Sequence, residues 1–200
     1  MVLKNAYNLY DGLQKLGITN LRQQQEAPMQ AIFDGKDAIV LMPTAGGKSL
    51  LYQLPAVMDD TGKLTLVISP LKALQLDQVD ALRSKGIRAA VLNSDLSAAE
   101  HSSVLEDMTR RGGLLYLAPE QLQNMAVADA LRTANLTRIA VDEAHTLPQA
   151  KDDFRKAYGK IGSFINSLSL HPQVIALTAT ATRRDVARIR KSLNIDNASL

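Results

Sequence analysis

Two separated stretches of this sequence contain residues able to carry out phosphate chemistry. The first is Met42-Pro-Thr-Ala-Gly-Gly-Lys-Ser49, which follows a short apolar run and precedes an apolar helical pattern. Small residues in such a turn let several backbone N–H groups converge on one point, toward which the following helix directs the positive end of its dipole. The stretch therefore predicts a phosphate-binding loop, in which Lys48 contacts the β- and γ-phosphates and Ser49 holds Mg²⁺.

This loop departs from the pattern G-x-x-x-x-G-K-[ST] at its first position, where Met42 replaces glycine. A Gly-Lys-Ser sequence alone is also compatible with an ordinary turn between a strand and a helix. The interpretation as a nucleotide site therefore depends on a second group of residues farther along the chain.

That second group is Asp142 and Glu143, which directly follow the apolar run Arg138–Val141. Adjacent residues on an extended chain point in opposite directions, so the two carboxylates can take different roles. We expect Asp142 to bind the Mg²⁺ shell, largely through water, and Glu143 to orient or deprotonate the water that attacks the γ-phosphate. Lys48, Asp142 and Glu143 are then the candidate catalytic residues. The alternative is a solvated acidic loop, which is the commoner setting of an Asp-Glu pair.

The composition is that of an ordinary globular protein, with 200 residues, 46% of them hydrophobic and 22% charged. This length suits one domain with a single substantial core. The net charge of +3 permits contact with nucleic acid without requiring it. The absence of cysteine excludes disulfides and thiolate metal sites. No apolar run is long enough to span a membrane, so we expect no membrane partner and a location in the cytoplasm (bacterial cytosol or nucleoid), or the nucleus of a eukaryote.

Short apolar runs alternate with helical patterns after two initial helices, which we predict over Asn5–Leu16 and Gln23–Phe33. The predicted strands are Ala38–Leu41, Leu64–Ile68, Ala89–Leu92, Leu114–Leu117, Ile139–Val141 and Val174–Leu177. The predicted later helices are Lys48–Met58, Leu71–Lys85, Ala98–Arg110, Gln121–Ala134, Tyr158–Leu168 and Arg183–Leu193. Ser97–Glu100 and Thr182–Asp185 have the spacing of capping boxes. This alternation predicts an α/β domain, with a mostly parallel sheet and helices on both faces.

In such a sheet, ligands bind beyond the carboxyl ends of the strands, and polar residues follow the apolar runs directly here. Three of these residues are His145, Thr178 and Thr180. We expect His145 to hydrogen-bond toward Thr178 and Thr180 and to couple nucleotide state to another surface rather than act in chemistry. The alternative is that the histidine is a structural donor and that the threonines only start the next helix.

Together, these segments resemble the first RecA-like motor lobe of a superfamily 2 helicase, most closely of the RecQ family. The similar segments follow in the family's order and cover nearly the whole chain: Met42–Pro55, Val67–Leu71 with Asp77–Val79, Leu114–Glu120, Ala140–His145 and Ala176–Ala181. The resemblance implies a RecA-like P-loop NTPase fold, ATP and Mg²⁺ as cofactors, and an ATP-dependent DNA helicase that separates strands in the 3′–5′ direction when joined to a second lobe. It also implies that residues 1–36 form N-terminal helices with an adenine-recognition segment and that residues 37–200 form the ATP-binding lobe.

The resemblance further assigns binding residues. Arg22 and Gln25 match the adenine-recognition segment, and a glutamine amide can both donate to and accept from the adenine edge. Without the family context, they are simply a glutamine-rich helix start at the surface. The family's phosphate-binding loop is matched by Thr44, Ala45, Gly46, Gly47, Lys48 and Ser49. Segments that contact single-stranded DNA in the family are matched by Ser69, Pro70, Lys72, Asn93, Ser94, Phe154 and Arg155.

Three positions depart from the family. Ile18 stands where an aromatic residue is common, and Ala45 stands where glycine is usual. If position 45 requires a positive φ, its Cβ costs about 1 kcal/mol. The loop Thr146–Tyr158 lacks the tryptophan expected near Ala150, so we expect weaker or different DNA sensing, since base stacking is worth ~1–3 kcal/mol per base.

The partners implied by the resemblance are single-stranded DNA, or duplex with a single-stranded tail, and a second RecA-like lobe that supplies arginine to the catalytic site. We expect the 200-residue chain alone to be monomeric, to bind ATP weakly, to hydrolyse it slowly and not to unwind duplex. Two alternatives stay open. One is a small-molecule or nucleoside kinase, which needs an acceptor pocket and a lid. The other is a nucleic-acid-binding or interaction module with little ATPase activity.

Overall fold

The computed structural model describes residues 6–59, 62–149, 157 and 159–200. Its centre is a sheet of six strands, all paired in parallel, in the order β1-β6-β5-β2-β4-β3. The strands are β1 (Ala38–Leu41), β2 (Leu64–Ile68), β3 (Ala89–Leu92), β4 (Gly113–Leu117), β5 (Leu136–Val141) and β6 (Gln173–Thr178). All six were predicted, and the parallel α/β architecture is confirmed.

The strand order fixes which loops meet at the carboxyl edge. β6 lies between β1 and β5, with Leu41 beside Thr178 and Val141 beside Ala176. The backbone N–H of Met42 extends this pairing by donating to the carbonyl of Thr178 at 3.0 Å. The chain that follows β1 and the chain that follows β5 therefore leave the sheet on either side of the end of β6.

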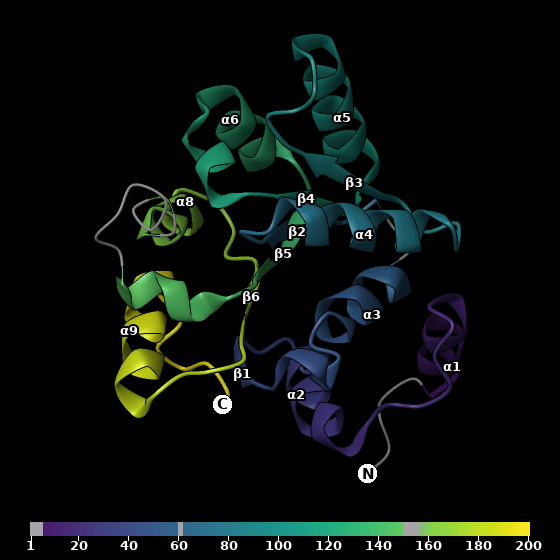
Figure 1. The fold of residues 1–200 in the computed structure, drawn as a ribbon, viewed down its shortest axis with the longest axis vertical. Coiled ribbons are helices and arrows are strands. Elements are labelled where there is room, and N and C mark those ends of the chain that lie inside the picture. The colour runs from purple at the N-terminus through teal and green to yellow at the C-terminus, as the bar shows by residue number, and fades with distance from the viewer. Residues whose placement is uncertain (1–5, 60–61, 150–156, 158) are drawn as a thin grey trace.

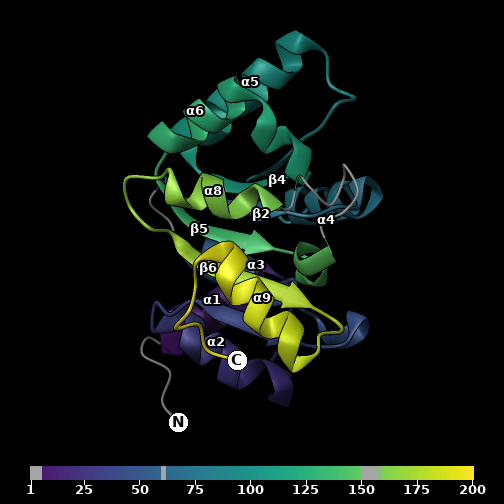
Figure 2. The same cartoon turned by 90° about the vertical axis from the view of Figure 1, so that its left-hand side faces the viewer.

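Helices cover both faces of the sheet, as Figures 1 and 2 show. Successive strand residues alternate between two buried clusters, because their side chains point to opposite faces. One face is covered by α1 (Ala6–Lys15), α2 (Gln23–Phe33), α3 (Leu50–Met58) and α4 (Lys72–Arg83). The other is covered by α5 (Ala98–Arg111), α6 (Met125–Thr133), α8 (Ile161–Asn166) and α9 (Arg183–Leu193).

The N-terminal helices share the core of the sheet. Met29 and Ile32 of α2 belong to the same buried cluster as Val40 of β1 and Leu54 of α3. The cluster also contains Leu13 of α1. The segment predicted to recognise adenine is therefore packed directly against the helix that follows the phosphate loop. Among the described residues, no helix is long and apolar enough to cross a bilayer.

Most predicted helices agree with the structure to within two residues, and both predicted capping boxes are present at Ser97 and Thr182. The single helix predicted over Gln121–Ala134 is wrong. A 3₁₀ helix, η2 (Pro119–Gln123), is separated from α6 by Asn124, whose side chain accepts a hydrogen bond from the N–H of Ala126 at 3.0 Å. An asparagine in an extended conformation caps the helix that follows it, which starts α6 afresh. Tyr158, the predicted start of the helix before β6, lies outside the described residues.

A close approach between α8 and the end of α9 requires glycine at position 162. A Cβ built at Gly162 would overlap the carbonyl oxygen of Ser192, which is backbone and cannot turn aside. We predict that Gly162→Ala lowers the free energy of unfolding by about 1–3 kcal/mol, the usual cost of overpacking, as measured by chemical denaturation. Ser163→Ala on the same helix is the matched control, because Ser163 is exposed. Equal stabilities for both variants would contradict this packing.

Candidate nucleotide-binding site

The predicted phosphate loop leaves β1 as a short 3₁₀ helix, η1 (Thr44–Gly46), and enters α3 through a turn at Lys48 and Ser49. Gly47 has a φ of 78°, in the left-handed region that favours glycine. Ala45 lies in η1 and is not among the non-glycine residues with positive φ in the described chain. The strain considered for Ala45 is therefore absent.

Met42, at the first position of the loop pattern, does not need to be glycine either. It lacks a positive φ, its backbone continues the ladder to β6, and its side chain is buried beside Gly46. A Cβ at Gly46 would overlap the Met42 side chain. The Met42 side chain thus occupies the space that Gly46, the first of the two loop glycines, leaves open.

Side chains from the start of α2 hold the carbonyl groups of this loop. Arg22 Nη1 donates to the carbonyl of Ala45 at 2.6 Å, and Gln24 Nε2 donates to the carbonyl of Gly46 at 3.3 Å. Gln25 Nε2 donates to the carbonyls of Gly46 and Gly47 at 3.2 and 3.0 Å, while its Oε1 accepts the N–H of Arg22 at 2.8 Å. Gln25 is 2% exposed. The predicted adenine residues therefore also fix the shape of the phosphate loop.

Lys48 is the most unusual cation in the described chain. It is 7% exposed, and its Nζ makes no hydrogen bond to any described residue. Burying an ammonium group without a partner costs free energy, so a structure normally retains one only where a ligand supplies the missing contacts. A phosphate oxygen is the anionic acceptor that fits a lysine at the end of a small-residue turn.

Asp142 lies beyond the end of β5 and is 8% exposed. Burial is the main reason why the pKa of its carboxyl is raised, and the nearby charge of Glu143 acts in the same direction. A hydrogen bond from the Glu143 N–H to Oδ1 at 3.0 Å and the positive charge of Lys48 lower this pKa. The two residues predicted to share one nucleotide therefore lie within electrostatic reach of each other.

Glu143 has a φ of 50°, one of two non-glycine residues with positive φ in the part of the chain that the structure describes. Left-handed backbone at a bulky residue is uncommon and costs about 1–3 kcal/mol. It turns the chain at the end of β5 into η3 (Ala144–Gln149), and the Glu143 carbonyl accepts from Thr146 N and Oγ1 at 3.0 and 2.8 Å. The acidic pair therefore lies in a strained turn rather than on the extended chain from which opposite directions were predicted.

His145 lies between the acidic pair and the end of β6. Its Nδ1 is 3.0 Å from Thr178 Oγ1 and 3.1 Å from Glu143 Oε2. Thr178 Oγ1 donates to the carbonyl of Thr180 at 2.9 Å. The structure thus brings together all three residues predicted to couple nucleotide state to another surface.

The predicted DNA-contacting residues divide into buried and exposed members. Ser69 and Asn93 are buried. Asn93 Oδ1 accepts the N–H of Asp95 and so shapes its loop, whereas the Ser69 hydroxyl has no hydrogen-bond partner among the described residues. Ser94 and Lys72 are exposed, and Lys72 Nζ donates to Ser94 Oγ at 2.7 Å and to Asp95 Oδ1 at 3.0 Å. Pro70, which lies between Ser69 and Lys72 in the sequence, is half-buried. Phe154 and Arg155 lie outside the described residues.

Two glutamines that touch the loop or its serine were not predicted from the sequence. Gln24 adjoins the predicted Gln25, so proximity in sequence was the available signal. Gln78 of α4 donates through Nε2 to Ser49 Oγ at 2.8 Å. It falls inside the Asp77–Val79 segment that carries the family resemblance, but nothing in its sequence context identifies its partner.

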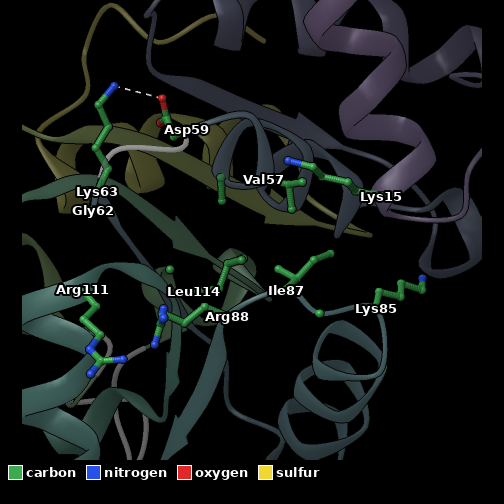
Figure 3. A pocket seen from close by; sticks show the side chains of 13 residues that line it. Lys15, Val57, Asp59, Gly62, Lys63, Lys85, Ile87, Arg88, Arg111 and Leu114 are labelled. Carbon is green, nitrogen blue, oxygen red and sulfur yellow. Dashed lines mark hydrogen bonds and ion pairs between the residues drawn. The ribbon is translucent and has the colours of Figure 1, made fainter.

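A hollow of about 320 Å³ lies at the opposite, amino end of the strands (Figure 3). Cations surround it, but these residues already have partners in the protein. Lys63 pairs with Asp59, Lys85 donates to the carbonyl of Leu16, and Arg88 and Arg111 pair with Asp107 outside the hollow. The hollow is separate from the residues around Lys48, which therefore remain the candidate site.

Comparison with known proteins agrees with this geometry. The pattern of the DEAD/DEAH box helicase family matches residues 22–189, and the chain belongs to that family. It is 41% identical over 186 residues to a probable ATP-dependent DNA helicase RecS of Bacillus subtilis, covering 92% of this chain and 37% of that protein. It is 38% identical over 200 residues to an ATP-dependent DNA helicase RecQ of Synechocystis, covering 96% and 41%.

The chain spans about two fifths of the length of these relatives. Among solved structures, it resembles the DUF1998 helicase MrfA with a TM-score of 0.74 and 22% identity, covering 96% of this chain and 32% of that one. That likeness concerns the fold. The family as a whole implies nucleotide use, and the similarity to RecQ and RecS proteins confirms the resemblance predicted from the sequence.

The raised pKa of Asp142 predicts a stabilising substitution. The raised pKa means that the folded state binds the proton of the Asp142 carboxyl more tightly than the unfolded chain does. The contribution of Asp142 to the free energy of unfolding therefore falls as the pH rises above 3.8, the ordinary pKa of this carboxyl. We predict that Asp142→Asn unfolds at a higher denaturant concentration than the parent at pH 7 and that the difference shrinks at pH 3. Asp196→Asn, at an exposed position, is the control. A less stable Asp142→Asn variant at pH 7 would show that attraction to Lys48 outweighs the cost of burial.

Proposed function

We propose that this chain is the first motor lobe of an ATP-dependent DNA helicase of RecQ type. The observation that carries the proposal is Lys48, a buried ammonium group with no hydrogen-bond partner among the described residues, within electrostatic reach of Asp142. A triphosphate and a divalent cation would satisfy both charges. Similarity to RecQ and RecS helicases over most of the chain supports the choice of a helicase over a kinase.

The donor set suits Mg²⁺. This ion usually takes one or two carboxylates and keeps its remaining positions for water and phosphate oxygens. Ser49 would supply a hydroxyl and Asp142 a carboxylate, in part through water, while the bound cation would neutralise charge on the phosphates. Glu143 would orient the attacking water and hold its proton. Thr44, Ala45, Gly46 and Gly47 would surround the phosphates.

Adenine recognition is proposed for Arg22 and Gln25. Both side chains donate to loop carbonyls, and the Gln25 side chain also accepts the N–H of Arg22, so base binding would require at least one of these hydrogen bonds to be exchanged for a bond to adenine. Since the same side chains hold the loop carbonyls, base binding would be coupled to the conformation of the phosphate loop.

Single-stranded DNA is the proposed partner, with Ser94 and Lys72 as exposed contacts to its phosphates and with Ser69, Pro70 and Asn93 shaping the loops that bear them. Phosphate contacts of this kind bind without reading sequence. Phe154 and Arg155 are proposed as further contacts on the family resemblance alone. His145, Thr178 and Thr180 are proposed to couple this surface to the nucleotide, and a second RecA-like lobe is proposed to complete the motor.

An interaction module with little ATPase activity is the second candidate. It is favoured by the absence of tryptophan from the chain, which removes the aromatic residue expected near Ala150. Mg-ATP binding separates the two candidates, because such a module would bind DNA without binding Mg-ATP.

We predict that Lys48→Met loses affinity for Mg-ATP by about 10–100-fold, since a charged hydrogen bond is worth about 1.5–3 kcal/mol. The same variant should be more stable than the parent without nucleotide, because it removes a buried charge that lacks a partner. Titration calorimetry and chemical denaturation measure the two effects. Lys191→Met is the control, because Lys191 is exposed on α9. Equal Mg-ATP affinity of Lys48→Met and the parent would refute the proposed nucleotide site.

We also predict that the 200-residue chain hydrolyses ATP about 10³–10⁵-fold more slowly than a protein in which it is joined to a second RecA-like lobe, the usual contribution of an arginine finger. Steady-state phosphate release with and without single-stranded DNA measures this ratio. Rapid, DNA-stimulated hydrolysis by the chain alone would contradict it.

A further inference from the structure

Gln78 of α4 is the centre of a polar cluster that joins three elements beneath the phosphate loop. Its Oε1 accepts from Tyr52 Oη at 2.9 Å, from Gln53 Nε2 at 3.0 Å and from Tyr116 Oη at 3.1 Å. Tyr52 and Gln53 lie on α3, and Tyr116 lies on β4. The tyrosine rings meet edge to face, with centroids 6.3 Å apart.

These contacts fix the orientation of the Gln78 amide. Burial raises the pKa of both tyrosines, that of Tyr116 to about 12, so both hydroxyls keep their protons at neutral pH. Because the oxygen of Gln78 accepts from three donors, its nitrogen is directed the other way, toward Ser49. An amide held on one side by three bonds can orient a hydroxyl on the other.

The bond from Gln78 determines what remains available on Ser49. A serine hydroxyl has one proton and two lone pairs, and Gln78 Nε2 occupies one lone pair at 2.8 Å. Because Tyr52 donates its own proton to Gln78, its hydrogen bond with Ser49 uses the Ser49 proton. One lone pair is left, which suits a divalent cation. A cavity of about 270 Å³ lined in part by Ser49, Gln53 and Gln78 adjoins this bond.

The helix that carries Gln78 also carries the exposed DNA candidate. Lys72 is at the first position of α4, and Gln75, one turn later, donates to the carbonyl of Ser69 at 2.6 Å. Gln78 follows after a further three residues. One short helix therefore contacts the serine of the phosphate loop and the loop proposed to meet DNA.

We propose that Gln78 is a positioning residue for Ser49, holding its hydroxyl ready to bind the divalent cation of a bound nucleotide. This inference rests on the proposed function, since Ser49 is the proposed cation ligand. It goes beyond that function because it makes the affinity for the cation depend on a side chain of α4 that orients the cation ligand Ser49. Outer-shell partners of this kind commonly change metal affinity about 10–100-fold when they are replaced.

The test uses the 200-residue chain and a fluorescent ATP analogue, titrated at a series of Mg²⁺ concentrations and separately in EDTA. For Gln78→Leu, we expect the Mg²⁺ concentration that gives the half-maximal gain in affinity to rise about 10-fold or more, with affinity in EDTA unchanged. Gln53→Leu is the matched control, because the Gln53 side chain belongs to the same cluster but bonds to Gln78 and Tyr116, and only the Gln53 backbone bonds to Ser49. It should retain the Mg²⁺ dependence of the parent.

A double-variant cycle separates positioning from a general loss of packing. In a Ser49→Ala background, Gln78→Leu should change the Mg²⁺ dependence less than about twofold, because the hydroxyl it orients is gone. Thermal unfolding checks each variant, and Gln78→Met replaces Gln78→Leu should the latter not fold.

The role of Gln78 would be overturned if Gln78→Leu lowered the affinity for the analogue equally in Mg²⁺ and in EDTA, or if its effect were undiminished in the Ser49→Ala background. Either result would leave the proposed function unaffected. Failure of the parent chain to bind the analogue in a Mg²⁺-dependent manner would instead overturn the proposed function and this inference with it.

Discussion

Two opposite charges that the fold removes from water at one edge of a parallel sheet constrain the rest of this structure. Lys48 and Asp142 are each less than a tenth exposed and come from segments on either side of β6. Their mutual attraction does not fully offset burial, since the pKa of Asp142 is still raised. Such an arrangement is costly in the absence of ligand, and that cost is the physical sign of a binding site.

The surroundings of these charges hold the loop and the strand ends in place. Arg22, Gln24 and Gln25 bind the carbonyl side of the loop, which leaves the opposite side of that turn for an anion. At the other end, His145 connects the strained turn at Glu143 to Thr178. Preorganisation of this kind lets a ligand meet polar groups that are already oriented, so less binding energy goes into ordering them.

Much of the fold could be predicted from the sequence because each of the six strands contains a short, largely buried apolar run that polar residues follow. β5 begins at Leu136, before the predicted Ile139, because Leu136–Arg138 are only half-buried and do not continue the apolar run. The continuous helix predicted across Asn124 is wrong because the Asn124 side chain caps α6 and interrupts the helical pattern. Whether the Cβ of Ala45 costs free energy depends on the φ angle at that position, which the residue type alone does not determine. At both positions, a short-range backbone conformation rather than the apolar pattern determines the structure.

The candidate site was predictable in its parts but not in its contacts. Lys48, Asp142 and His145 lie in segments that follow strands, and the rule that ligands bind at the carboxyl edge of a parallel sheet predicts from the sequence that they lie close together. Gln78 and the burial of Asn93 could not be inferred in this way. A helix pattern identifies which face is apolar, but it does not reveal which polar side chain meets a residue 29 positions away.

A crystal structure of the chain with Mg²⁺ and a non-hydrolysable ATP analogue would show whether Lys48 and Asp142 bind one nucleotide. We expect a phosphate oxygen hydrogen-bonded to Lys48 Nζ, with the cation held on the side of Ser49 and Asp142. An analogue bound elsewhere, with Lys48 still buried and without a phosphate partner, would contradict it.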